Sequence, residues 1–354
     1  MLAANCLLTS VIRAPQRLST LSGKEWDLLI RQGRRANLLA RIAYLARTEN
    51  FAAELPPAPH GHLLAADTLA ASQVQAIRHE LKKLAEALDN AGLRAVLLKG
   101  AAYLAADLPC ARGRLFGDID LMVPKPQLAL AESTLMLHGW AAGHHDEYDQ
   151  RYYRRWMHEV PPLQHVTRLS IVDLHHAILP ETARAPSPAT PLFEAAIPLP
   201  GTPFSVLSPT DMTLHSATHL FHEGEFHNGL RDLCDLDSLL RYFSRNEPEF
   251  WQRLTDRAAE LNLSTSLRHA LRYTKQAFCT PVPDAFSPKR RGFVDALFTR
   301  AFAPDHASCR DIWTPLSRWL LYLRGHWLRM PPWLLIRHLF HKAFITPKKQ
   351  SGLN

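Results

Sequence analysis

The chain has 354 residues, of which 47% are hydrophobic and 21% are charged, and a chain of this size buries a substantial core in two or three domains. The composition excludes a disordered chain, a collagen-like chain and a disulfide scaffold. The net charge of +8 comes from the two ends of the chain. Residues 1–50 hold eight Lys/Arg and three Asp/Glu, and residues 311–354 hold seven Lys/Arg and one Asp. The region between them is slightly acidic. A long nucleic acid is therefore not expected as a partner.

Apolar periodicity predicts a helical start, a short mixed segment and a helical end. Helices are predicted at 20–48, 63–91, 101–107 and 126–138, and strands at 95–98, 118–123, 163–167 and 170–176. A linker is expected at 54–61 and a proline-rich connector at 180–207. Ser208 and Asp211 match a capping box, and nearly all of the chain from there to residue 345 is predicted to be helix with proline breaks.

This order predicts an α+β fold with a small mixed sheet. The core is expected at 93–200, between a helical region at 1–92 and a second one at 201–354 that ends in a basic, aromatic tail. The five cysteines form no CxxC pair, which is typical of reduced thiols in a cytoplasmic protein. We recognise no signal peptide, and no stretch reaches the ~18 unbroken apolar residues that a membrane helix needs.

Three aspartates in strand-like runs are the candidate chemical groups. Asp118 and Asp120 lie two residues apart on a predicted strand, so both carboxylates project from one face, ~7 Å apart. Asp173 lies in a second apolar strand. Three such acids would suit two Mg²⁺ ions ~3.5–4 Å apart, the arrangement used for phosphoryl transfer. The alternatives are a solvated strand end for the first pair and a salt bridge to a nearby arginine for Asp173.

Three sequence runs together resemble the polymerase-β-type nucleotidyltransferase superfamily. They are LLKG at 97–100, RLFGDIDLMV at 114–123 and VDLHH at 172–176. They are most similar to a bacterial branch with the pattern LKG, R, DIDLLV and DLH. Two further runs, SPTDMTLHSATHLFHEG at 208–224 and LRDLCDLDSLL at 230–240, are similar to the helical segment of that branch.

The resemblance implies a function and a set of site residues. The chain would transfer an NMP group from an NTP to an acceptor hydroxyl with release of pyrophosphate. The metal-binding and catalytic carboxylates would be Asp118, Asp120 and Asp173, holding two Mg²⁺ ions. The nucleotide would contact Lys99, Gly100, Arg114, His175 and His219. The sequence departs from the superfamily at Lys99-Gly100-Ala101, where better-known relatives have a Gly-Ser that grips the triphosphate.

Other histidines on the same predicted helix permit a second interpretation. His215, His219 and His222 recur at helical spacing, which would suit a zinc ion. We favour the simpler interpretation, a polar face that lines the substrate cleft. Asp235, on the next helix, is expected to cap a helix or to form a salt bridge.

Two other functions and one further partner remain open. The first alternative is a catalytically silent member that binds or scaffolds, and the second is a glycosyltransferase that uses D-x-D to bind a metal. The acceptor would be a small molecule, a peptide or a protein. An apolar stripe in the tail would either touch an anionic membrane or pack on the body with its arginines outward; its members are Leu316, Trp319, Leu320, Leu323, Trp327 and Met330.

Overall fold

The fold was obtained as a computed structural model, which describes residues 6–51, 55–143, 156–288 and 292–331. The helices are α1 Leu7–Arg13, α2 Gly23–Arg35, α3 Leu39–Thr48, α4 Pro57–Asn90, α5 Lys99–Ala105, α6 Leu128–Leu137, α8 Thr190–Glu194, α9 Pro209–His222, α10 Gly229–Asn246, α11 Phe250–Glu260, α12 Ser264–Phe278, α13 Phe293–Ala301 and α14 Thr314–Arg329. The strands are β1 Ala95–Leu97, β2 Asp118–Met122, β3 Trp140–Ala142, β4 Leu163–His165, β5 Ile171–His175, β6 Ile197–Pro198 and β7 Phe204–Val206.

The strands form one mixed sheet of seven, in the order β3-β4-β5-β2-β1-β7-β6. Strand β2 pairs in parallel with β5 and antiparallel with β1, and β1 pairs in parallel with β7. Alternate residues of β2 and β5 face a buried layer that includes Ile119, Leu121, Val172 and Leu174. The opposite face of these two central strands is the one that presents the aspartates.

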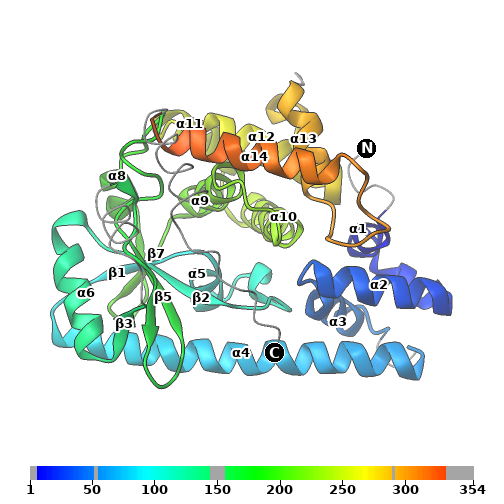
Figure 1. The fold of residues 1–354 in the computed structure, drawn as a ribbon, viewed down its shortest axis with the longest axis horizontal. Coiled ribbons are helices and arrows are strands. Elements are labelled where there is room, and N and C mark those ends of the chain that lie inside the picture. Colours follow the sequence, from blue (N-terminus) through cyan, green and yellow to red (C-terminus); the bar gives the residue numbers. More distant parts are fainter. Residues whose placement is uncertain (1–5, 52–54, 144–155, 289–291, 332–354) are drawn as a thin grey trace, which may run out of the picture.

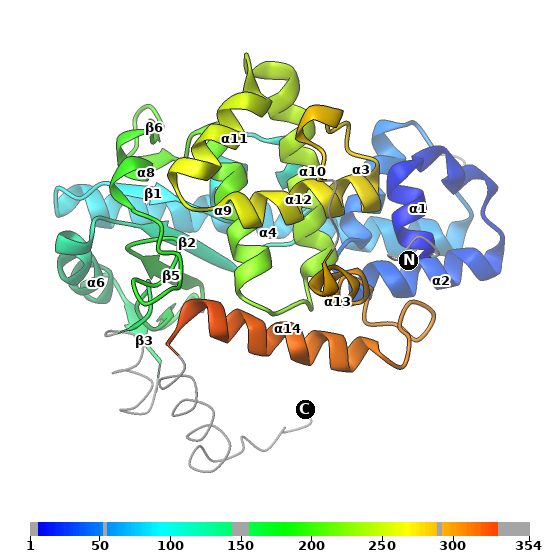
Figure 2. The same ribbon diagram turned by 90° about the horizontal axis from the view of Figure 1, so that it is seen from above.

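Helices cover the sheet and extend well beyond it, which confirms the predicted α+β class. Figure 1 shows the long helix α4 running along one side of the molecule, beneath the sheet at one end and beneath α2 and α3 at the other. Figure 2 shows α9, α10 and α12 between the sheet and the N-terminal helices, with α14 along one edge. No helix in the described part of the chain is long and apolar enough to cross a membrane.

The structure corrects three predicted elements and adds one strand. The helix expected at 20–48 is two helices, because Asn37 adopts a left-handed φ of 53° that asparagine tolerates better than most residues. Helix α4 starts at Pro57, inside the expected linker, since proline suits the first helical position. The connector at 180–207 contains α8, β6 and β7, so the sheet extends to Val206, and the chain also forms β3, which was not predicted.

Helix α14 packs on the body through its less apolar face. Thr314, Ser317 and Gly325 are buried, whereas Trp319 of the predicted stripe is 55% exposed. Arg318 and Arg324 donate hydrogen bonds to backbone carbonyls of the body, so the expectation of outward arginines was wrong for these two. The second tail helix, expected after Pro332, lies outside the described residues.

Candidate active site

The pairing of β2 with β5 brings two of the three aspartates together. Asp120 is directly opposite Asp173 in the parallel register, and neighbouring strands are roughly 4.8 Å apart. Asp118, two residues earlier on the same face, is exposed at the start of β2, opposite Ile171. Three carboxylates from two separate parts of the sequence therefore share one face of the sheet.

Lys99 and His175 both contact Asp120, which is only 2% exposed. Its Oδ1 accepts a hydrogen bond from Lys99 Nζ at 2.9 Å and is 3.2 Å from His175 Nε2. Burial opposes ionisation, but the Lys99 ammonium and the His175 imidazole hold the pKa of Asp120 well below its usual range. Lys99 adopts a left-handed φ of 45°, a strained conformation for lysine at the first residue of α5. Asp120 is therefore a carboxylate at neutral pH.

Asp173 has the opposite electrostatic situation. Its Oδ1 is buried without a hydrogen-bond partner. Burial and the negative charges of Asp120 and Glu159 raise the pKa of Asp173 to about 7. The two adjacent aspartates thus differ in proton affinity, and Asp173 has a buried oxygen without a partner, whereas Asp120 is paired.

A second polar group lies next to these aspartates, and sequence reasoning missed most of it. The segment at 158–160 runs antiparallel to the end of β5, where Glu159 forms a bridge with His175. Glu159 Oε2 is 3.3 Å from His175 Nδ1. Burial opposes protonation of His175, but Asp120 and Glu159 raise its pKa. The only available signal was a His-Glu pair in a segment with no strand periodicity.

Helix α9 contributes the opposite wall of the site. His219 Nε2 is 2.9 Å from Glu223 Oε2, and burial opposes ionisation of Glu223 while His219 and Lys99 lower its pKa. His222 Nδ1 instead contacts Ser266 Oγ at 3.1 Å. His219 and His222 thus have different partners. Among the described residues, the side chains that could hold a metal ion are those of His158, Glu159 and His175, so the structure does not support the zinc interpretation of this helix face.

Two glycines allow α14 to pack closely against the end of α9. Gly224 has a left-handed φ of 80°, and a Cβ there would come within 2.8 Å of the Leu321 carbonyl oxygen. A Cβ at Gly325 would come equally close to the carbonyl oxygen of Glu223. The close packing brings Arg329 to this wall, where its Nη2 donates to that same carbonyl oxygen at 3.1 Å.

Arg114, which was expected to contact phosphate, is buried in the structure. Its guanidinium is buried between the rings of Tyr103 and Phe116, and Nε donates to Asp235 at 2.9 Å. A Cβ at Gly100 would lie 2.5 Å from Arg114 Nη1, so this glycine makes room for the arginine. Arg114 therefore forms an internal ion pair, and its contact with phosphate stays a prediction. Asp235 forms the salt bridge that was one of its two expected roles.

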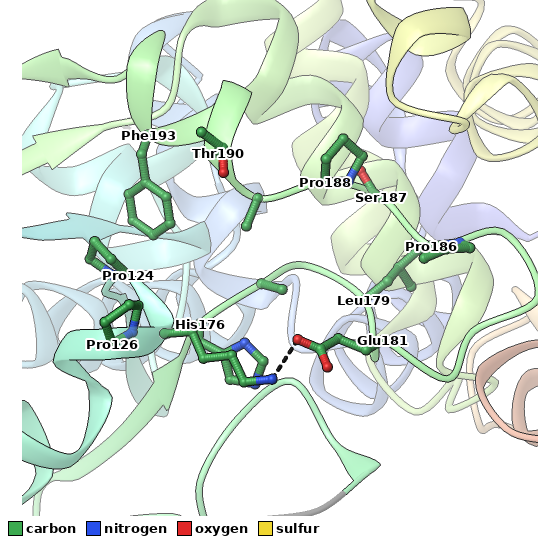
Figure 3. A pocket seen from close by; sticks show the side chains of 13 residues that line it. Pro124, Pro126, His176, Leu179, Glu181, Pro186, Ser187, Pro188, Thr190 and Phe193 are labelled. Atoms are coloured by element: carbon green, nitrogen blue, oxygen red, sulfur yellow. Dashed lines mark hydrogen bonds and ion pairs between the residues drawn. The ribbon is translucent and has the colours of Figure 1, made fainter.

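A separate pocket of about 460 Å³ opens at the carboxyl ends of β2 and β5 (Figure 3). Pro124 and Pro126 face Pro186 and Pro188 across it. The ion pair of Glu181, drawn as a dashed line, is with Lys125 at 2.6 Å. No predicted site residue lines this pocket, so it is distinct from the aspartate face.

A mixed sheet with aspartates on adjacent parallel strands, flanked by helices, defines an α+β protein of the nucleotidyltransferase type. Residues 22–279 match the model of a family described as "Uncharacterised nucleotidyltransferase". That match covers more than half of the chain, and the chain belongs to this family. No curated protein matches the sequence significantly. The same is true of the solved structures.

Proposed function

We propose that the chain is a Mg²⁺-dependent nucleotidyltransferase of the polymerase-β type that moves an NMP group from an NTP to an acceptor hydroxyl. The observation that supports this most directly is the strand register, which sets Asp120 beside Asp173 on one face. Membership of a nucleotidyltransferase family supports the same reaction class. The NTP supply of the cytoplasm makes that compartment the natural one for this reaction.

The residues at this face fit a divalent cation. Asp173 has a buried oxygen without a partner, and Asp118 is open to solvent on the same face. Mg²⁺ prefers carboxylate oxygens together with substrate phosphates. Asp118, Asp120 and Asp173 would hold one or two ions, and bound Mg²⁺ would supply positive charge to the α-phosphate and the leaving pyrophosphate.

The chain's own residues would orient the reactants and handle the proton. Lys99 and Arg329 bring positive charge to opposite walls of the site and would position the triphosphate. Asp173 would accept the proton of the acceptor hydroxyl while the hydroxyl oxygen bonds to the α-phosphorus. The bond from the α-phosphorus to the bridging oxygen breaks, and pyrophosphate leaves. His175 would position Asp120 through the 3.2 Å contact, and His219, paired with Glu223, would contact the nucleotide.

Labelled nucleotides test this proposal. The purified chain is incubated with α-labelled NTPs, Mg²⁺ and a cell extract that supplies acceptors, and the labelled product is separated from free nucleotide. Asp120→Asn should reduce labelling by about 10²–10⁴-fold, since each ~1.4 kcal/mol of lost transition-state stabilisation is tenfold in rate. Asp107→Asn is the matched control, because Asp107 is 84% exposed at its side chain and has a left-handed φ that asparagine accepts.

The same assay separates the alternatives. Label transfer that persists in Asp120→Asn contradicts the proposed role of that residue. Binding of Mg-NTP without turnover on any acceptor would favour a silent binding protein. The Lys99–Asp120 ion pair is consistent with this alternative, because the lysine already neutralises the carboxylate. Transfer of sugar with release of a nucleoside diphosphate would identify a glycosyltransferase instead.

The exposed residues at and before α14 favour an additional membrane contact. Ile312, Trp313, Leu316, Trp319 and Trp327 are all at least 44% exposed. Tryptophan is the residue that favours the membrane–water interface. Flotation with anionic liposomes should decrease when Trp313 and Trp319 are replaced by serine, and equal flotation would exclude this contact.

A further inference from the structure

We propose that His158, Glu159 and His175 form a binding site for a transition-metal ion of the Zn²⁺ class, separate from the carboxylate positions proposed for Mg²⁺. One potential ligand atom from each residue lies within 4.8 Å of the other two. Two imidazoles and one carboxylate are the donor set of many catalytic zinc sites, which keep a fourth position open. The proposal does not depend on the nucleotidyltransferase activity.

The backbone holds the three residues in place. His176 N donates to the carbonyl oxygen of His158 at 2.8 Å, and Val160 N donates to that of Leu174 at 3.0 Å. These bonds on either side of Glu159 lock the segment antiparallel to the end of β5, where Glu159 is opposite His175. The bridge therefore fixes Glu159 opposite His175, and His158 precedes it directly in the chain.

The spacing suits a tetrahedral ion. His175 Nδ1 and Glu159 Oε2 are 3.3 Å apart. For an ion about 2.1 Å from both atoms, the angle between the two bonds would be about 105°, close to the tetrahedral value. The rings of His158 and His175 have centroids 5.5 Å apart, and a potential ligand atom of His158 lies within 4.8 Å of those of Glu159 and His175.

An unsatisfied buried nitrogen points independently to a missing partner. His158 is only 6% exposed, and its Nδ1 has no hydrogen-bond partner. A buried polar atom without a partner is costly, and a bound cation is one of the few groups that would satisfy a bare imidazole nitrogen here. The Glu159 carboxylate, 3.3 Å from His175 Nδ1, would supply negative charge to a divalent ion.

The contact with Asp120 completes a known pattern of metal sites. A histidine that binds a metal through one nitrogen usually donates its other N–H to a carboxylate, which orients the ring. His175 has this arrangement, with Nε2 at 3.2 Å from Asp120 Oδ1 and Nδ1 directed at Glu159. The imidazole ligands favour Zn²⁺ or Co²⁺ over Mg²⁺, which takes oxygen ligands.

Cobalt spectroscopy on the full chain tests the site. Co²⁺ is titrated into the metal-free protein in the presence of excess Mg²⁺, and the visible d–d bands and the bound stoichiometry are measured. We expect one equivalent of Co²⁺ with the spectrum of a four- or five-coordinate ion, displaced by Zn²⁺. Substitutions His158→Gln and Glu159→Gln should weaken Co²⁺ binding by more than the roughly 10–100-fold that loss of an outer partner costs.

Two variants control for folding and for the neighbouring carboxylates. His176→Gln alters the next residue after His175, which lines the pocket of Figure 3, and it should bind Co²⁺ like the wild type. Asp118→Asn removes an exposed carboxylate proposed for Mg²⁺ and should also leave Co²⁺ binding unchanged. Absence of the d–d bands in the wild type would overturn the proposal. The proposal would also be overturned if Asp118→Asn abolished Co²⁺ binding while Glu159→Gln retained Co²⁺ binding. The Glu159 side chain is partly exposed, so Glu159→Gln should not prevent folding.

Discussion

Replacing Asp173 by asparagine should stabilise the metal-free protein above neutral pH. Burial and the charges of Asp120 and Glu159 raise the pKa of Asp173 from 3.8 to about 7 in the folded chain. The unfolded chain therefore loses this proton first as the pH rises. A group with a raised folded pKa contributes stability that is fully present below pH ~4, and this stability is lost as the pH rises through about 7.

The magnitude follows from the pKa difference. The step from 3.8 to about 7 corresponds to about 4 kcal/mol, at 1.36 kcal/mol per unit. Because the side chain is partly exposed, we expect Asp173→Asn to increase the free energy of unfolding by about 2–4 kcal/mol at pH 8. With an unfolding entropy of about 2.1 cal/mol/K per residue over 354 residues, Tm should rise by about 3–5 °C. At pH 4.5 the gain should be below about 1 kcal/mol.

Thermal denaturation followed by circular dichroism measures this effect in EDTA at pH 4.5 and pH 8. Asp118→Asn is the control, because that carboxylate shares the face of Asp120 but is exposed, and its Tm should equal that of the wild type. Adding Mg²⁺ at pH 8 should raise the Tm of the wild type more than that of Asp173→Asn. A variant with an unchanged Tm at pH 8, or with the same gain at both pH values, would refute the assignment of an uncompensated charge to Asp173.

Two other predictions concern the packing that supports the site. Gly100→Ala should destabilise the protein by about 1–3 kcal/mol, since its Cβ would lie 2.5 Å from the buried Arg114 guanidinium, whereas Gly61→Ala, with open space around it in α4, should stabilise by up to about 1 kcal/mol. Urea denaturation of both variants compares them, and equal stabilities would contradict the packing role of Gly100. Asp235→Asn should cost about 3–5 kcal/mol, because it leaves the buried guanidiniums of Arg114 and Arg41 without their carboxylate. A loss below about 1 kcal/mol in the same experiment would show that this pair does not join α10 to the core.

Local periodicity is sufficient to place the aspartates on the strands. The alternation of Asp118 and Asp120 with Ile119 and Leu121 predicts both the strand and the face of each carboxylate, because successive strand residues point to opposite sides. Ser208 likewise caps α9 as expected, with its side chain accepting from Asp211 N, since a capping motif lies within one turn of the chain. These features depend only on neighbours a few residues apart.

Features that depend on distant pairing could not be predicted. The short strands β6 and β7 are too small to show periodicity, and β7 is defined by its parallel pairing with β1, more than 100 residues earlier. The same limit applies to Arg114, whose partner Asp235 comes from a helix 121 residues later. Its charge suggested phosphate, and only packing revealed a buried ion pair.

The composition of the site shows the same division. The sequence alone determined which acids could act, because Asp120 and Asp173 each interrupt an apolar strand. Only the tertiary structure decided that they are direct neighbours, that Lys99 and His175 contact one of them, and that His158 and Glu159 lie beside them. The reason is physical: side-chain direction is set by local backbone geometry, whereas contact between strands is set by the free energy of packing the whole sheet.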